Sequence, residues 1–232
     1  MNLKELETKI GFHFKDQAIL NEALTHRSYL NEKPKWPFPH NERLEYLGDA
    51  VLELVTTEAL YKKFPSYPEG QLTVLRAALV NYQNMAQVAL ELKLEKFIYL
   101  SKGEAKDEGK AREVILANAI EALIGAIYLD QGLNPVASFI DKFILHGLDV
   151  IIKTKSYKDS KSTLQEIIQE KLKLTPTYQV LEEDGPAHQK TFRVGVYFGN
   201  DLIADGLGHS KQEAEVEAAK KALKQMKPRP KS

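Results

Sequence analysis

The sequence of 232 residues contains no cysteine and no long uninterrupted apolar run. The absence of cysteine excludes disulfides and thiolate zinc sites, and it suits a reducing compartment. The best candidate for a membrane helix, residues 114–129, is interrupted by Asn118 and Glu121 and falls short of the roughly 18–20 apolar residues required. The N-terminus lacks the apolar core of a signal peptide. These absences predict a soluble, cytoplasmic protein with no membrane partner.

The formal net charge is zero, because 32 Lys and Arg residues balance 32 Asp and Glu residues. The overall charge therefore does not indicate nucleic-acid binding, although a local arrangement of charge can still steer a polyanion. Apolar residues make up 43% of the chain, which is enough for one or two domains with cores of their own.

Three carboxylates recur on one side of a helix predicted between residues 40 and 54. At about 100° per residue, Glu42, Glu45 and Asp49 fall within about 60° of one another, opposite an apolar side. Such a stripe is either a solvated acidic face or a site for a divalent cation, because hard cations take clustered carboxylate oxygens.

A second stretch, residues 114–129, is apolar on nearly every side and predicts a buried core helix. Its polar members Asn118 and Glu121 lie one turn apart and share a face. An unpaired buried carboxylate costs on the order of several kcal/mol. Glu121 therefore either hydrogen-bonds a neighbouring side chain or, with Asn118, faces Glu45 and Asp49 across a helix pair. The second arrangement creates an oxygen-rich pocket.

Two motifs carry a resemblance to a known family. N-E-R-L-E-Y-L-G-D-A-V-L at 41–52 resembles the signature of bacterial ribonuclease III, and A-N-A-I-E-A-L-I-G-A-I-Y-L-D at 117–130 resembles its second catalytic helix. The resemblance runs from about Leu3 to Leu223. It implies an endonuclease that cleaves double-stranded RNA, as in ribosomal and messenger RNA processing, and leaves 5′-phosphate and 3′-hydroxyl ends. The implied cofactor is Mg²⁺, with Mn²⁺ as a substitute.

The resemblance also implies residue roles. Glu45, Asp49, Asn118 and Glu121 are the expected metal ligands, directly or through water, and Asp49 and Glu121 are the expected catalytic residues. The family usually has aspartate where this chain has Asn118. An asparagine carbonyl can ligate a cation but brings no charge, so we expect weaker Mg²⁺ binding. A double-stranded RNA-binding protein with impaired or no cleavage is the alternative.

Cutting both strands of a duplex with one site per protomer implies a symmetric homodimer. Tyr46 stands where the family has an aromatic residue that packs into the partner subunit, and the alternative is that Tyr46 belongs to the core. Glu42 is expected to be an outer-sphere or domain-contact residue, and Glu69 an accessory one. His26 is expected to be structural.

The sequence pattern predicts two domains. Residues 1–152 are helical throughout, which gives an all-α endonuclease domain by resemblance, and the polar residues 153–159 are predicted to form a linker. In residues 160–227 the predicted order is helix, three strands and helix, which matches a small α+β double-stranded RNA-binding domain.

RNA-binding residues follow from the resemblance to that second domain. Gln165 and Gln169 match positions that read 2′-hydroxyls and base edges in a minor groove. The remaining expected contacts are one loop (Pro186, His188 and Lys190) and the start of the last helix (Ser210, Lys211 and Gln212). Gln212 replaces a second lysine that the family often has, which removes one phosphate contact. The more distal lysines of the last helix are expected to be ordinary solvated surface.

Overall fold

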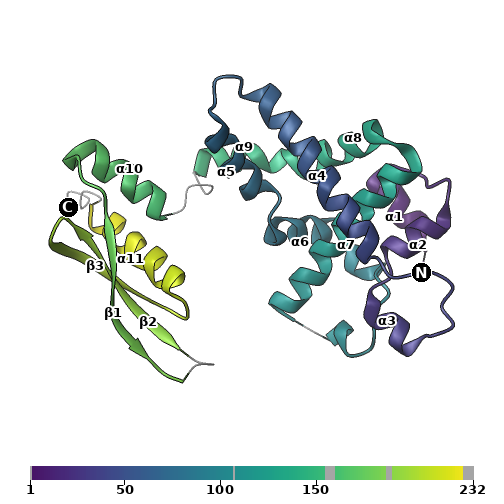
Figure 1. The fold of residues 1–232 in the computed structure, drawn as a ribbon. Coiled ribbons are helices and arrows are strands. Elements are labelled where there is room, and N and C mark those ends of the chain that lie inside the picture. Colours follow the sequence, from purple (N-terminus) through teal and green to yellow (C-terminus); the bar gives the residue numbers. More distant parts are fainter. Residues whose placement is uncertain (1, 107, 155–159, 187–189, 227–232) are drawn as a thin grey trace, which may run out of the picture. The chain divides into compact units, whose positions relative to one another are not determined.

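The computed structural model describes residues 2–106, 108–154, 160–186 and 190–226 (Figure 1). The chain divides into two compact units, Met1–Tyr157 and Lys158–Ser232. Each unit is described by itself. The domain limits at residues 152 and 160 stay a prediction.

Unit 1 is helical, as predicted. Its elements are α1 (Leu3–Ile10), α2 (Gln17–Ala23), α3 (Arg27–Glu32), α4 (Glu42–Lys63), α5 (Glu69–Leu79), α6 (Tyr82–Glu91), η1 (Leu94–Lys96), η2 (Glu104–Lys106), α7 (Lys110–Gln131), α8 (Leu133–Phe143), η3 (Leu145–Gly147) and α9 (Leu148–Thr154). The only β-type pairing among its described residues is an isolated bridge between Thr25 and Tyr99.

Local sequence signals set several helix ends. Gly11 ends α1 in the left-handed conformation at φ +83°, which glycine adopts without steric cost. The Asp16 carboxylate accepts a hydrogen bond from the Ala18 amide at 2.8 Å and caps α2, a role that an aspartate directly before the helix predicts. His26 caps the short helix α3, which was not predicted, by accepting from the Ser28 amide. The expected structural role of His26 agrees with this contact.

The apolar residues of 136–152 lie on one face and predict a single helix, and this prediction is wrong. The structure has α8 and α9 instead, with the 3₁₀ turn η3 between them. The turn ends at Gly147, a residue type that disfavours the helix interior. Pro135 lies within the first turn of α8, where its missing N–H has no helical partner to lose.

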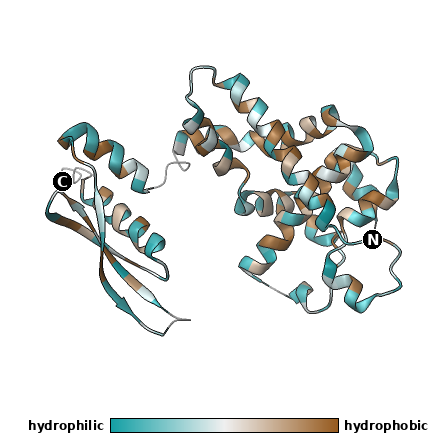
Figure 2. Cartoon of the chain, viewed as in Figure 1, coloured by the Kyte–Doolittle hydropathy of each residue, from teal (hydrophilic) through white to brown (hydrophobic). Residues whose placement is uncertain are grey.

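The core of unit 1 is built around α7, as its apolar sequence predicts. Its buried residues lie on nearly every side of the helix, from Ile115 to Ile127. Figure 2 shows hydrophobic residues concentrated where the helices pack together. Helices α4 and α6 make the most extensive contacts with α7. A polar side chain within residues 115–127 of α7 therefore lies where other helices pack against it.

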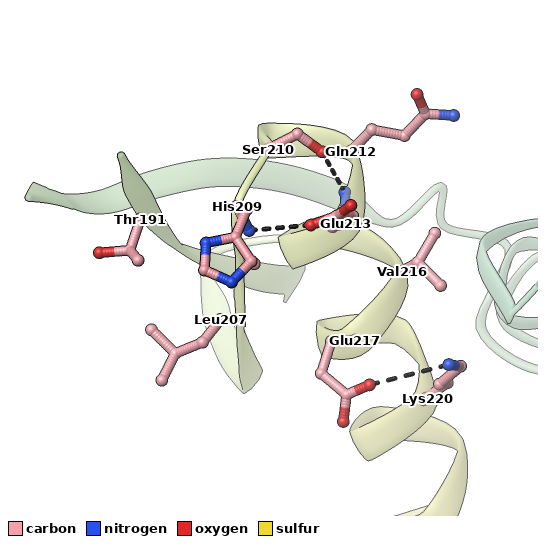
Figure 3. A pocket seen from close by; sticks show the side chains of 10 residues that line it. Thr191, Leu207, His209, Ser210, Gln212, Glu213, Val216, Glu217 and Lys220 are labelled. Carbon is pink, nitrogen blue, oxygen red and sulfur yellow. Dashed lines mark hydrogen bonds and ion pairs between the residues drawn. The ribbon is translucent and has the colours of Figure 1, made fainter. Parts of the chain in front are cut away.

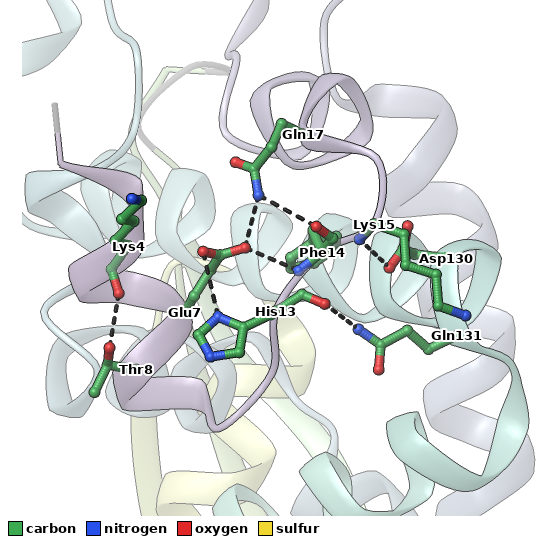
Figure 4. A network of polar contacts seen from close by, with 9 residues as sticks. All are labelled: Lys4, Glu7, Thr8, His13, Phe14, Lys15, Gln17, Asp130 and Gln131. Carbon is green, nitrogen blue, oxygen red and sulfur yellow. Dashed lines mark hydrogen bonds and ion pairs between the residues drawn. The ribbon is translucent and has the colours of Figure 1, made fainter.

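The C-terminal end of α7 is tied to the start of the chain (Figure 4). The Asp130 carboxylate accepts hydrogen bonds from the Lys15 amide at 3.0 Å and the Asp16 amide at 2.9 Å. The Gln131 side chain donates to the His13 carbonyl at 2.9 Å. These bonds fix one end of the central helix.

Unit 2 has the predicted α-β-β-β-α order, and the predicted fold class is confirmed. Its elements are α10 (Ser160–Leu172), β1 (Thr177–Asp184), β2 (Thr191–Phe198), β3 (Asp201–Gly208) and α11 (Lys211–Met226). The strands form an antiparallel sheet in the order β1-β2-β3. The inward face of β2 packs with both helices through a core that includes Val196, Leu164 and Ala218.

Candidate catalytic site and nucleic-acid interface

Helices α4 and α7 touch through backbone at a pair of glycines. A Cβ added at Gly48 would lie 1.7 Å from the carbonyl oxygen of Glu121, and one added at Gly125 would lie 2.3 Å from that of Leu44. No real Cβ approaches backbone atoms so closely. The two helices can therefore meet at this distance only because both positions lack a side chain.

This crossing brings four predicted residues together. Gly48 lies directly before Asp49 and three residues after Glu45, and its contact on α7 is the backbone of Glu121. The Asn118 side-chain amide lies close enough to the Glu45 carboxylate, across the helix pair, to favour the charged form of that carboxylate. Asp49 is exposed, whereas Glu45 and Glu121 are half-buried. The site therefore has one edge open to solvent and a recessed carboxylate behind it.

The electrostatics of the cluster are unbalanced. Burial, reinforced by the negative charges of Asp49 and Glu45, raises the pKa of Glu121 to about 7. Burial also raises the pKa of Glu45. Repulsion from Glu42 and Asp49 raises this pKa further, and the nearby Asn118 amide opposes the rise. Within the described parts of the chain, no protein hydrogen bond reaches the Glu121 carboxylate, so the predicted alternative of a locally paired Glu121 finds no support.

The cluster lacks the preformed geometry of a metal site. No three His, Cys, Asp or Glu side chains among the described residues converge closely enough to hold an ion by themselves. The donors present are all oxygens with excess negative charge, and this chemistry fits a hard divalent cation.

Two further acidic residues, Glu42 and Glu69, have polar partners of their own. Glu42 is exposed and pairs with Arg27 at 3.2 Å and with His40 at 3.8 Å. Glu69 begins α5 and accepts a hydrogen bond from Thr73 at 3.1 Å. It lines a separate pocket with Thr57, two turns along α4 from Asp49. The outer-sphere and accessory roles of Glu42 and Glu69 stay predictions.

Tyr46 is 83% exposed, so the alternative that it belongs to the core is wrong. It borders a pocket lined partly by Ile19, Leu47 and Leu129. Further along the same side of α4, Leu54 and Tyr61 are 57% and 70% exposed. The described surface of α4 thus carries an apolar stripe beside the acidic cluster.

In unit 2, the predicted RNA-reading residues of α10 are free to contact a ligand. Gln165 and Gln169 are exposed and lie one turn apart. At the start of α11, Lys211 and Gln212 are also exposed. The four side chains stand at the surface, as a groove-reading role requires.

Ser210 has a structural role that the sequence did not indicate. Its hydroxyl accepts a hydrogen bond from the Glu213 amide at 3.1 Å, and the Glu213 carboxylate accepts one from the His209 amide at 2.9 Å (Figure 3). Together these bonds form a capping box that fixes the first turn of α11. The S-x-x-E spacing at 210–213 is the signal that would have revealed it.

Two lysines from separate segments converge on one aromatic ring. The ammonium groups of Lys190 and Lys211 lie 6.0 and 5.7 Å from the centre of the Phe192 ring. Lys190 is also paired with Glu183 on β1. Pro186 is exposed, and the predicted contact His188 lies outside the described residues. A small basic surface therefore joins the start of β2 to the start of α11, with one carboxylate next to it.

Comparison with known proteins bears on both units. A Ribonuclease-III-like family model matches residues 16–148, and the double-stranded RNA binding motif matches residues 160–226. The chain is 46% identical to Ribonuclease 3 of Carboxydothermus hydrogenoformans over 97% of this chain and 96% of that protein. The chain belongs to the ribonuclease III family. Ribonuclease 3 of Nitratiruptor sp. is 44% identical, with 98% of each chain covered.

Solved structures of the ribonuclease III family agree with this assignment. The nuclease domain of ribonuclease III from Campylobacter jejuni is 42% identical and aligns with a TM-score of 0.57, covering 62% of this chain and 97% of that one. A second structure of the same domain gives a TM-score of 0.56 at 42% identity. Similarity of this extent covers the whole nuclease domain.

The family and its two domains define the activity. The chain is a metal-dependent endoribonuclease that cleaves double-stranded RNA, and the alternative of a non-cleaving RNA-binding protein is not favoured. In the described part of the chain, no helix is both long and apolar enough to cross a membrane. The predicted cytoplasmic location stays a prediction.

Proposed function

We propose that Glu45, Asp49, Asn118 and Glu121 hold Mg²⁺ at the glycine crossing of α4 and α7, and that this site hydrolyses the phosphodiester bond. Mg²⁺ held there would lower the pKa of water and would neutralise negative charge on the departing oxygen. Mn²⁺ is expected to substitute, because it accepts the same oxygen ligands. The observation that supports this most directly is the recessed Glu121 carboxylate, whose pKa is raised to about 7 by burial and by Asp49 and Glu45.

The four residues have different proposed roles because their side chains differ in exposure to solvent. Asp49 stands at the solvent edge, where a phosphate of the duplex can approach it. Glu121 lies behind it, where its charge is poorly solvated and favours a cation strongly. Asn118 places a neutral amide beside Glu45 and offers its own carbonyl oxygen as an uncharged metal ligand. Attack by water then leaves a 5′-phosphate and a 3′-hydroxyl.

The experiment incubates the purified protein with a long RNA duplex in Mg²⁺, in Mn²⁺ and in chelator. We expect cleavage in both metals and none in chelator. Asp49→Asn and Glu121→Gln are each expected to abolish cleavage while leaving duplex binding intact. Glu58→Gln is the matched control, because Glu58 is an exposed acid further along α4 that pairs with Lys62. Cleavage that survives in either Asp49→Asn or Glu121→Gln would refute the site.

We also propose that the enzyme acts as a symmetric homodimer through the apolar stripe of Tyr46, Leu54 and Tyr61. An exposed stripe of large apolar side chains is unusual on a monomer and suits an isologous contact. The nuclease domain of Campylobacter jejuni ribonuclease III has a structurally flexible region involved in dimer formation, which supports the same assembly here. Sedimentation equilibrium of the protein is expected to give a dimer that Tyr46→Ala weakens, whereas a monomeric wild-type protein would contradict this.

For RNA recognition we propose that Gln165, Gln169 and Lys211 contact one face of the duplex, together with the loop at 186–190 and Ser210 and Gln212. Such contacts read A-form shape more than sequence. Paired Gln165→Ala and Gln169→Ala changes are expected to weaken duplex binding measured in chelator. Unchanged binding would refute this face while leaving the catalytic proposal standing.

A further inference from the structure

The two helices of unit 2 enclose a groove that the proposed RNA-binding residues do not use. It has a volume of 460 Å³ and is lined from both helices, by Ser160, Thr163, Ile167 and Lys171 of α10 and by Lys220, Leu223, Lys224 and Met226 of α11. Its composition and its position on the unit both bear on what it binds.

The groove has an apolar floor and a basic rim. Ile167, Leu223 and Met226 are each half-buried, so the core of the unit leaves part of every one of these side chains uncovered. Around them, three exposed lysines line the groove, Lys171, Lys220 and Lys224. Such a surface is complementary to a ligand with apolar side chains on one side and carboxylates around them.

The positive charge of this rim is poorly neutralised. None of the described residues that line the groove is acidic. Among the described residues, Lys171 and Lys224 have no ion-pair partner, and Lys220 has only a long contact of 3.8 Å with Glu217 (Figure 3). Binding a partner with carboxylates therefore requires breaking no strong ion pair.

The groove faces away from the proposed RNA contacts. At 100° per residue, Ile167 and Lys171 lie on a stripe of α10 roughly 160° from the mean direction of Gln165 and Gln169. On α11 the groove begins at Lys220, nine residues after Lys211. This separation corresponds to about 13 Å along the helix axis. A duplex held by Gln165, Gln169 and Lys211 leaves the groove open.

We propose that the groove between α10 and α11 docks an acidic, amphipathic peptide segment of a partner protein while double-stranded RNA is bound. An amphipathic helix presents apolar residues at i, i+3, i+4 and i+7, which suits a groove between two helices. A duplex offers charged phosphates and hydroxyls and nothing to cover the apolar floor. The simultaneous binding of RNA rests on the proposed RNA face, whereas the groove itself does not.

The probe is a fluorescein-labelled peptide of about 18 residues, five helical turns, with leucines on one face and glutamates on the other. Fluorescence anisotropy with the full-length protein in chelator gives its Kd. A peptide with lysine in place of every glutamate controls for apolar binding alone. We expect the acidic peptide to bind and the basic one not to bind.

Two variants test the location. Lys171→Glu combined with Lys224→Glu reverses the rim and is expected to weaken peptide binding at least about tenfold. Lys221→Glu is the matched control, because Lys221 is an exposed lysine of α11 outside the groove, and it is expected to change the Kd less than about twofold. Equal losses in both variants, or no binding of the acidic peptide, would overturn the proposal.

Adding a saturating RNA duplex separates a protein site from an RNA site. We expect the peptide to stay bound. If the duplex displaces it, and rim reversal weakens duplex binding as well, the groove is an RNA surface and the proposal is wrong. Failure of the RNA face would show instead in the Gln165 and Gln169 variants, which leave peptide binding unchanged.

Discussion

Asn118 combines two properties that an aspartate cannot combine. Its amide group lies beside Glu45 and favours the charged form of that carboxylate, and its carbonyl oxygen stays available as a neutral ligand. A carboxylate in its place would repel Glu45 and would add a fourth negative charge to a site where the pKa of Glu121 is already raised to about 7. This chain therefore has one negative charge fewer in its cluster than the usual family pattern, and it has an amide instead of a carboxylate beside Glu45.

Asn118→Asp is expected to lower the Mg²⁺ concentration needed for half-maximal cleavage, because the added carboxylate increases attraction for the cation. In chelator, the same change is expected to lower the free energy of unfolding by roughly 1 kcal/mol, because the added carboxylate repels the Glu45 carboxylate. A Mg²⁺ titration of cleavage and a urea titration measure the two effects. The charge argument is wrong if the Mg²⁺ dependence does not move.

Glu183 is expected to limit RNA binding, because it pairs with Lys190 beside Lys211 and competes with a phosphate. Glu183→Gln is expected to tighten duplex binding roughly two- to fivefold and to steepen its salt dependence by about one counterion. Glu182→Gln is the matched control, since Glu182 pairs with Arg193 instead. An affinity that stays the same or falls would contradict this role.

Glu7 links stability to pH. Burial opposes its ionisation, but hydrogen bonds from Phe14 at 2.8 Å and Gln17 at 2.7 Å, with His13 nearby, outweigh burial and hold the pKa of Glu7 below its ordinary value (Figure 4). A depressed pKa contributes stability above the unfolded value of 4.5, and this contribution is lost as pH falls through the folded pKa.

Glu7→Gln is therefore expected to lower the free energy of unfolding by roughly 1–3 kcal/mol at neutral pH. The difference from wild type should shrink as the pH falls below about 4.5. Urea unfolding in chelator at several pH values measures it. Glu5→Gln, an exposed glutamate of the same helix, should change stability little. A pH-independent difference would mean that the loss comes from packing alone.

At the scale of elements, the crossing of α4 and α7 positions the site. The contact is made by backbone at Gly48 and Gly125, and the acidic residues lie within one turn of it on both helices. Separating the helices would move Glu45 and Asp49 away from Asn118 and Glu121 together.

Gly125→Ala is expected to reduce cleavage at least about tenfold and to cost roughly 1–3 kcal/mol of stability, because the new Cβ collides with the Leu44 carbonyl. Duplex binding in chelator should persist. Gly147→Ala is the matched control, since a Cβ there meets nothing within 4 Å. Wild-type cleavage by Gly125→Ala would show that the spacing does not matter.

Local signals in the sequence predicted most elements, and contacts between distant segments escaped prediction. Periodicity and capping residues such as Asp16 were sufficient for single helices, because these signals act within a few residues. The break between α8 and α9 was missed, since the apolar residues of 136–152 continue on one face through it. The pairing of Glu183 with Lys190 and the glycine contact depend on segments meeting in space, which no local pattern reveals.

At the scale of the whole molecule, the two units have separate cores. We expect residues 160–227 to fold alone, bind a duplex and leave it uncut, because their core is complete within that range. Residues 1–152 should retain the acidic cluster and bind duplex RNA far more weakly. Circular dichroism and anisotropy test both fragments, and an unfolded 160–227 fragment would show that the proposed domain limits are wrong.

The meeting of Gly48 and Gly125 makes the distance between the catalytic helices insensitive to most of the core. Main-chain atoms already in contact cannot move closer, and their spacing does not depend on the volume of any side chain at that point. Substitutions elsewhere in unit 1 can then accumulate without changing the spacing of the acids. The crossing therefore sets the spacing between the two helices. The two segments that form it could be transplanted into a different helical scaffold and keep that spacing.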